Sequence, residues 1–406
     1  MTNHRGVLVN TTVADRELDA NDLAGLIGAT PENLLYLSGG LEPTGHVVSK
    51  YTTNVFAIAP RGEYDAPVLV AGLGEMGQIR QVCPPGARIV HFGSFTRYVD
   101  ADAELDEHEA WVKHWVVDTP GRPNALEALV AGIEEAGLAS ARVGYDERGM
   151  SPELVAAVSE RLPGLELVPA FALIRRIRLV KTPEEIERLT QSLRLTEEAI
   201  QAALAIAAVG VQEEDLIREF RMSVVGGGAG TLANEITFTR RAATGGHAVQ
   251  DGVLKEGDII RFDVGCRVGG YCSDIARLYA FRGDVDPRAQ AIYDAMAAGE
   301  ERAMAAMRPG VTAREIFHEA VEGVKEAGVP EYKRNHVGHA VGLEVYDGCL
   351  LAPGDETVLE AGMTFEVETP YYEIGFLGIQ IEDTVIVRED GHEMITELPR
   401  TIERVG

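Results

Sequence analysis

The feature that most restricts how this chain can fold is an internal repeat in its second half. Residues 210–219 and 310–319 both begin with Gly-Val, place an acid and two apolar residues at the sixth to eighth positions, and end in Glu. Each copy follows an alanine-rich stretch with helical spacing, begins another helix and leads to a predicted hairpin. Two copies of helix, helix and hairpin predict an α+β domain with pseudo-twofold symmetry.

Superposing the two copies places acidic residues of the predicted hairpins opposite one another. The hairpins run over 258–277 and 363–387, with glycines near each turn. In this superposition Asp263 corresponds to Glu368, and Asp274 corresponds to Glu382. Each arm of each hairpin therefore carries one acid, set among residues that favour buried strands.

Four buried carboxylates without partners would be too costly in an interior of low dielectric constant, so a compensating positive charge is required. Arg261, Arg277 and neighbouring lysines offer one solution, an ordinary network of ion pairs. Two divalent cations offer the other, because they would neutralise all four acids and complete their coordination at once. The symmetric register of the acids favours metal.

The segment 335–343 adds His336 and His339 in a glycine-rich, apolar setting. One imidazole nitrogen among many oxygen ligands suits manganese, cobalt, iron or zinc better than calcium. Two such metals that share a water molecule lower its pKa, which indicates hydrolysis. We expect two divalent cations, with manganese the first candidate.

The first part of the chain alternates short apolar runs with helical stretches, as an α/β layer does. The runs at 33–38, 55–59 and 67–71 are predicted strands, whereas 123–136 and 151–161 are predicted helices. A helix start at Thr182-Pro183-Glu184-Glu185 follows a basic segment. We therefore expect an α/β domain over 1–172 and an α+β domain over 173–406.

Charge and hydropathy restrict the partners. The chain has 64 acidic and 37 basic residues, a formal net charge of -27, which repels nucleic acid and anionic lipid. The N-terminus lacks a secretory signal pattern, and the longest weakly polar stretch, 199–212, is too short to span a membrane. With four cysteines and no Cys-x-x-Cys pair, we expect a soluble cytoplasmic protein with reduced thiols.

These motifs resemble the pita-bread metallopeptidases, the group that contains prolidase, aminopeptidase P, methionine aminopeptidase and the metal-free relative creatinase. Residues 262–265 resemble the first ligand strand of that family, 270–277 the second, 338–343 the histidine segment, and 378–384 the last strand. Tyr36-Leu37-Ser38-Gly39 and 181–186 resemble the two-domain prolidase and creatinase branch. The resemblance spans nearly the whole chain and implies a pita-bread catalytic domain behind a creatinase-like N-terminal domain.

The resemblance also implies roles for individual residues. Asp263 would chelate one metal, His339 and Glu368 would bind the other, and Asp274 and Glu382 would bridge both. His247 would contact the substrate and stabilise the transition state, while Glu368 would accept a proton from the attacking water. Creatinase has lost this ligand set, so its direct reaction is disfavoured here.

Two positions depart from the pattern of the prolidase-like members. Tyr346 stands where they usually carry a second histidine, and it can donate a hydrogen bond but cannot carry positive charge. Gln380 stands where they commonly carry an arginine, two residues before the last glutamate, and Thr369-Pro370 replaces Pro-Gly. Partners of metal ligands tune metal affinity and ligand basicity, so these changes bear on the substrate.

We expect a dinuclear metallohydrolase for small peptides with proline after the scissile bond, acting as a homodimer of the Xaa-Pro dipeptidase or aminopeptidase P type. Two alternatives stay open. One is a metalloenzyme on the same scaffold that cleaves a non-peptide amide or performs lyase chemistry on a small metabolite. The other is a binding protein without catalysis, although such a chain has little physical reason to keep four buried carboxylates.

Overall fold

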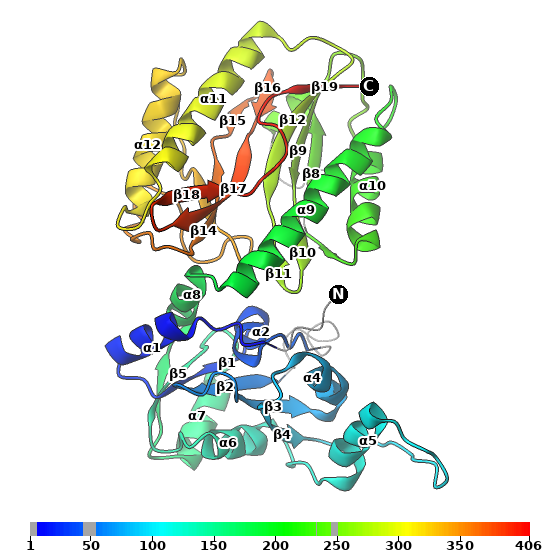
Figure 1. The fold of residues 1–406 in the computed structure, drawn as a ribbon, viewed down its shortest axis with the longest axis vertical. Helices are drawn as coiled ribbons and strands as arrows, with labels where there is room; N and C mark the ends of the chain where they lie inside the picture. Colours follow the sequence, from blue (N-terminus) through cyan, green and yellow to red (C-terminus); the bar gives the residue numbers. More distant parts are fainter. Residues whose placement is uncertain (1–5, 44–53, 233, 245–250) are drawn as a thin grey trace. The chain divides into compact units, whose positions relative to one another are not determined.

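The computed structural model describes residues 6–43, 54–232, 234–244 and 251–406. The chain divides into two compact units, Met1–Arg178 and Leu179–Gly406 (Figure 1). The division lies within helix α8 (Phe171–Leu179). The domain limits expected from the sequence, 1–172 and 173–406, assign most of that helix to the second domain and remain a prediction.

The first unit is built on a mixed six-stranded sheet in the order β4-β3-β2-β1-β5-β6. Its helix α6 (Ala125–Glu135) packs against β3 and β4 and contributes Leu129 and Ile133 to the core of the unit. The strands are β1 (Gly25–Gly28), β2 (Phe56–Pro60), β3 (Val68–Gly72), β4 (Arg88–Phe92), β5 (Arg142–Tyr145) and β6 (Glu166–Pro169). The other α-helices are α1 (Thr11–Ala20), α2 (Pro31–Ser38), α4 (Met76–Val82), α5 (Glu107–Lys113) and α7 (Pro152–Arg161).

One predicted strand of this unit is wrong. Residues 33–38 belong to the helix α2, whose residues from Asn33 to Ser38 are all buried. A short run buried on every side has no polar face, so its hydrophobicity cannot separate helix from strand. The decisive signals were Pro31 in the first helical turn and Gly39, which ends the helix with a φ of 79°.

The second unit contains an eight-stranded sheet with the central order β13-β14-β17-β12-β9-β8. In Figure 1 two helix pairs flank it, α9 (Pro183–Ala205) with α10 (Glu213–Gly226), and α11 (Pro287–Ala306) with α12 (Ala313–Glu326). The sheet strands are β8 (Glu235–Phe238), β9 (Ile259–Val264), β12 (Ile275–Phe281), β13 (Gly338–Ala340), β14 (Thr364–Glu368), β17 (Glu382–Arg388), β18 (Gly391–Met394) and β19 (Glu403–Val405). Short strands outside it are β7 (Gly230–Thr231), β10 (Cys266–Val268), β11 (Tyr271–Cys272), β15 (Tyr371–Glu373) and β16 (Leu377–Ile379).

The strand order shows the predicted duplication directly. The strands β12 and β17 meet at the centre, β9 and β14 lie outside them, and β8 and β13 follow. Each half therefore contributes three strands, in mirrored order. This confirms the α+β fold expected for the second part of the chain. None of the helices in the described ranges has the length and hydropathy required to cross a membrane.

The repeated motif marks the start of the second helix in each half. Gly210 and Gly310 both adopt positive φ values, 94° and 91°. In the second copy the Thr312 hydroxyl accepts a hydrogen bond from the Glu315 backbone N–H, and the Glu315 carboxylate accepts one from the Thr312 N–H, a capping box. The repeated acid is therefore a helix-start signal.

We expect Thr312→Ala to lower the free energy of unfolding by about 1 kcal/mol, because the first turn of α12 loses its side-chain cap. Urea unfolding of the full chain, followed by circular dichroism, measures this change. Thr312→Ser keeps the hydroxyl and is the matched control. Equal stability of the alanine and serine variants would contradict the role given to the cap.

Candidate metal centre

The register of the sheet places three of the expected acids in one row. Asp263 on β9 pairs with Ala276 on β12, which pairs with Glu382 on β17, which in turn pairs with Glu368 on β14. Residues directly opposite one another on antiparallel strands project to the same face. Asp263, Glu382 and Glu368 therefore share one face, with the small side chain of Ala276 between them.

The other two expected ligands project to that face as well. Asp274 lies two residues before Ala276, and residues two apart along an extended chain point the same way. His339 on β13 pairs with Glu366, which lies two residues before Glu368 on β14. The fold thus brings to one face five side chains that are spread over the sequence from Asp263 to Glu382, 119 positions apart.

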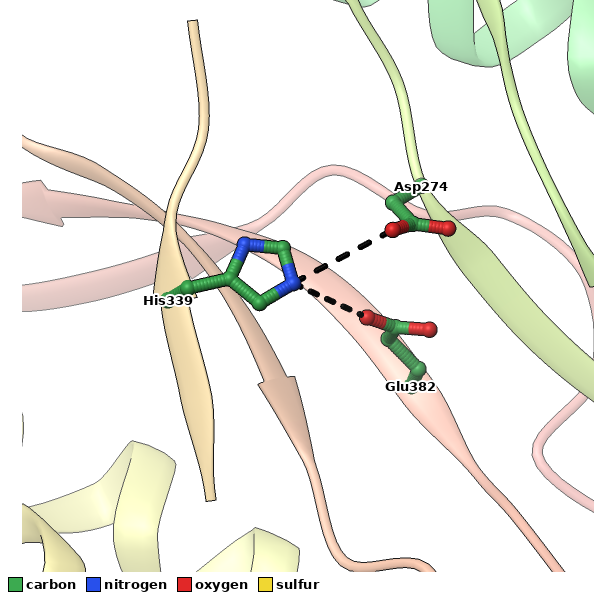
Figure 2. Close-up of side chains that lie close together, drawn as sticks. All are labelled: Asp274, His339 and Glu382. Atoms are coloured by element: carbon green, nitrogen blue, oxygen red, sulfur yellow. Dashed lines mark ion pairs between the residues drawn. The ribbon is translucent and has the colours of Figure 1, made fainter. Parts of the chain in front are cut away.

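Three of the five form a compact group. The His339 Nε2 atom lies 4.0 Å from Asp274 Oδ2 and 3.8 Å from Glu382 Oε1 (Figure 2). One ligand atom from each of the three residues lies within 4.8 Å of the others. Figure 2 shows the imidazole from one strand facing the two carboxylates from the opposite side. This spacing suits a cation held between them.

Burial sets the protonation of the group. It lowers the pKa of the His339 imidazole to about 4, so the ring is neutral at pH 7 and its nitrogen lone pair is available. Burial raises the pKa of the Asp274 carboxyl well above its usual range, and the negative charge of Asp263 adds to the effect. Burial and the charge of Asp274 raise the pKa of Glu382 in the same way. Both carboxyls lack the positive charge that would make ionisation favourable.

A buried oxygen without a hydrogen-bond partner also indicates that a cation binds here. The buried Glu382 Oε2 atom has no hydrogen-bond partner in the described part of the chain. Buried polar atoms are almost always satisfied, and each exception calls for an explanation such as an ion. One imidazole and several carboxylates form a donor set for manganese, iron, cobalt or zinc. The residues present therefore fit a divalent cation.

The two remaining expected ligands are held by protein partners. The Asp263 Oδ2 atom accepts a hydrogen bond from Arg261 Nη1 at 2.9 Å. Glu368 Oε2 accepts one from Gln380 Nε2 at 3.2 Å, and its Oε1 lies 3.3 Å from His336 Nδ1. These contacts orient Asp263 and Glu368 at the two ends of the row.

Arg261 and Gln380 connect those two ends. Arg261 Nη1, which donates to Asp263, also donates to Gln380 Oε1, and Gln380 in turn donates to Glu368. Gln380 stands where the resemblance places an arginine, and in the structure the guanidinium of Arg261 on β9 contacts it. Arg261 is 1% exposed, and its Nη2 atom lies 2.7 Å from Glu235 Oε2.

The alternative of an ordinary ion-pair network accounts for only part of the charge. Arg261 neutralises Asp263 and Glu235 in part, whereas Arg277 projects to the other face of the sheet because it follows Ala276 directly. There Arg277 pairs with Asp383 and donates to the backbone carbonyl of Glu382 at 2.8 Å. The positive charge of Arg277 is therefore paired on that other face and does not neutralise the row of acids.

Glu366 is a carboxylate of the site that the sequence reasoning missed. It is fully buried on β14, and on the neighbouring strands it pairs with His339 and Thr384. Burial raises its pKa to about 8. The alternation Glu366-Val367-Glu368 was the available signal, because it places both glutamates on one face of β14.

Tyr346 lies directly on the site. Its ring stacks on the His339 ring, with centroids 3.8 Å apart and planes at 23°. The side chain is 47% exposed, so solvent or a substrate can reach it. Burial and the charge of Glu368 raise its phenol pKa above the usual range, which keeps the O–H group protonated. His247, the other expected catalytic residue, lies outside the described residues.

Comparison with protein families gives two matches in the chain. Residues 187–389 match metallopeptidase family M24, and residues 13–180 match the creatinase/prolidase N-terminal domain. Together they account for both units of the fold.

Individual relatives agree with these matches. An uncharacterized peptidase of Staphylococcus saprophyticus is 31% identical over 246 residues, which cover 57% of this chain and 69% of the relative. A Xaa-Pro dipeptidase of Pyrococcus furiosus is 31% identical over 231 residues, 56% of this chain and 66% of the relative.

Solved structures share the fold over almost the full length. A Xaa-Pro dipeptidase from Bacillus anthracis superposes with a TM-score of 0.76 at 22% identity, covering 98% of this chain and 100% of that one. Prolidase from Pyrococcus furiosus superposes with a TM-score of 0.71 at 24% identity, covering 95% and 99%. The expected pita-bread architecture with a creatinase-like first domain is confirmed.

We expect the metal-free chain to lose on the order of 1–2 kcal/mol of stability between pH 7 and pH 8.5. Burial raises the pKa of Glu368 to about 7 and that of Glu366 to about 8. In this range the folded chain holds protons that the unfolded chain has already lost, so stability falls as the pH rises. The pKa of His339 is lowered to about 4, so its titration changes the stability only at lower pH.

Urea unfolding after treatment with a chelator measures this dependence. Glu366→Gln removes one of the titrating groups and should flatten the curve. Added manganese should abolish the loss, because the cation replaces the protons. A metal-free wild-type chain that gains stability over the same range would contradict the description of the site.

Proposed function

This chain belongs to metallopeptidase family M24, and we propose that it hydrolyses small peptides at the bond that precedes a proline. The observation that carries the proposal is the face of the eight-stranded sheet on which Asp263, Asp274, His339, Glu368 and Glu382 come together. The Xaa-Pro dipeptidase of Pyrococcus furiosus supports the choice of substrate.

The five residues would hold two divalent cations, with manganese the first candidate and cobalt, zinc or iron the others. Asp274, His339 and Glu382 already lie close enough to share a cation. Asp263 and Glu368 extend the set at either end of the row. Bound there, the cations would polarise the scissile carbonyl and lower the pKa of the attacking water.

Glu368 is the proposed general base. In the metal-free chain burial raises its pKa to about 7. A bound cation would favour the ionised carboxylate, which is the form that accepts a proton. Gln380 and His336 fix its two oxygens in place. It would take a proton from water and pass it to the leaving nitrogen. The nitrogen of proline carries no N–H in a peptide, so it must gain a proton as it leaves.

Tyr346 is the proposed hydrogen-bond donor. Its partly exposed phenol stays protonated and lies over His339, where it can donate to the oxygen that gains negative charge in the transition state. We also keep the proposal from the sequence that His247 contacts the substrate. The expected homodimer and cytoplasmic location remain predictions.

A second candidate function has a specific observation in its favour. Tyr346 covers the imidazole of His339, and Arg261 takes part in the contacts at Gln380, so the surroundings of the ligands differ from the expected prolidase pattern. Such changes accompany new substrates on an old scaffold. The alternative is a metalloenzyme that acts on a non-peptide amide or another small metabolite.

A panel of Xaa-Pro dipeptides and Xaa-Pro-Xaa tripeptides, tested with manganese-loaded full chain, distinguishes the two. We expect cleavage before proline, and loss of activity on the order of 1,000-fold in Glu382→Gln, equivalent to about 4 kcal/mol. Glu389→Gln, an exposed change in the adjacent turn, is the matched control and should keep full activity. No cleavage by a chain that holds two metals would favour the alternative.

A further inference from the structure

Tyr346 lies in an irregular segment. Residues 341–349, all of which the structure describes, form neither helix nor strand. Two backbone hydrogen bonds bring this segment back beside β13: the Asp347 N–H donates to the Ala340 oxygen at 2.8 Å, and the Ala340 N–H donates to the Cys349 oxygen at 2.8 Å. Tyr346 therefore comes to lie over His339, the residue before Ala340. A side chain on such a segment is held in place less precisely than one on a strand, unless other contacts support it.

A buried ion pair supplies such a contact. Lys181 Nζ lies 3.6 Å from Asp347 Oδ2, and the two side chains are 0% and 1% exposed. Asp347 directly follows Tyr346 in the chain. Lys181 lies just before α9, and its backbone N–H donates to the Gly362 oxygen at 3.0 Å, close to the start of β14. The pair therefore ties the residue beside Tyr346 to a backbone that is itself bonded to the sheet region.

Gly342 leaves the space that this pair occupies. A Cβ atom at position 342 would lie 2.1 Å from Asp347 Oδ2 and 3.0 Å from Lys181 Cε. Gly342 does not adopt a positive φ, so the space and not the backbone conformation requires glycine here. The two charged side chains are thus packed closely against the backbone of the segment that carries Tyr346.

Lys181 also acts on a second carboxylate, that of Glu185 on α9. Burial raises the pKa of Glu185 to about 7, and the charge of Lys181 acts against this rise. Glu185 has hydrogen-bond donors of its own, because its Oε1 accepts from the Tyr271 hydroxyl at 3.0 Å and its Oε2 from the Thr182 N–H at 2.7 Å. A change at Asp347 therefore removes the contact with the segment and leaves the contacts of Glu185 in place.

Stability alone does not explain a buried pair of this kind. The cost of removing two charges from water offsets much of their attraction, and apolar side chains of similar volume often serve equally well. An ion pair differs from apolar side chains in its directionality, because each buried charge requires its partner at one place. Next to Tyr346, this property fixes one arrangement of an otherwise irregular segment.

We propose that the Lys181–Asp347 ion pair is a positioning device that holds Tyr346 over His339. The inference rests on the proposed function for the role of the phenol, whereas the placement of the ring is a claim about the structure alone. Without the pair, the segment takes several arrangements, and the hydroxyl occupies the donor position for only part of the time. The turnover rate then falls more than the affinity for substrate.

Fluorine NMR of the full chain tests the placement directly. The chain is labelled with 3-fluorotyrosine and loaded with zinc, whose filled d shell does not broaden the signals. Loss of one signal in Tyr346→Phe identifies Tyr346. We expect one narrow Tyr346 signal in the wild type, shifted by the stacked imidazole, and a broadened signal closer to that of the unfolded chain in Asp347→Asn. Thr312→Ala, which weakens α12, is the control for general destabilisation and should leave the Tyr346 signal unchanged.

A second variant separates positioning from stability. Lys181→Met combined with Asp347→Leu replaces the pair with apolar side chains that need no partner, so we expect this double variant to fold. The Tyr346 signal should broaden in it as in Asp347→Asn. If Asp347→Asn does not fold, the double variant decides. A Tyr346 signal with the position and width of the wild type in the folded double variant would overturn the inference.

Kinetics of the manganese-loaded full chain test the consequence for the reaction, with the best substrate of the Xaa-Pro panel. Tyr346→Phe removes only the hydroxyl and should lower kcat on the order of 100-fold. Asp347→Asn should lower kcat on the order of 10-fold, with a smaller change in KM. The two changes together should be no slower than Tyr346→Phe alone, because both act through the same hydroxyl.

Losses in kcat that multiply in the combined variant would overturn the inference, since the pair would then act independently of Tyr346. If the wild type cleaves no peptide of the panel, the proposed function fails, and the fluorine signal alone decides whether the pair places the ring. A failure of the proposed function and a failure of this inference are therefore distinguishable.

Discussion

Repulsion between carboxylates on one face of the eight-stranded sheet is the constraint that organises the second unit. Asp263, Asp274, Glu366, Glu368 and Glu382 all project to this face, and Arg261 pairs with Asp263 at one end of the row. Burial and mutual repulsion raise the pKa of Asp274 and Glu382. The fold is therefore strained electrostatically unless protons or cations occupy the centre, and at neutral pH divalent cations satisfy it best.

The mirrored strand order explains how the chain assembles such a centre. Because β12 and β17 meet at the middle of the sheet, equivalent acids from the two halves face one another across the junction. Arg277 secures this junction from the opposite face by donating to the backbone carbonyls of Ala276 and Glu382. The acids repel one another on one face, while on the other an ion pair with Asp383 holds their strands together. Because side chains alternate between the two faces of a strand, the acids lie on one face and the Arg277–Asp383 ion pair lies on the other.

Much of this arrangement was predictable because it depends on periodicity along the chain. The repeat at 210–219 and 310–319 predicted the duplication, and the hairpin acids predicted the shared face. Contacts across strands were not predictable in the same way. The position of Arg261 between Asp263 and Gln380 depends on the three-dimensional spacing of β9 and the segment before β17. In the first unit, full burial of α2 removed the polar face that separates a helix from a strand.

Metal content after equilibrium dialysis is the most direct test of the account. The full wild-type chain and Glu382→Gln are stripped with a chelator, dialysed against the same micromolar manganese, and analysed for bound metal. The account predicts two manganese ions per wild-type chain, and loss of at least one in the variant, because Glu382 lies next to both His339 and Asp274. A wild-type chain that stays folded at neutral pH and binds no manganese would contradict it.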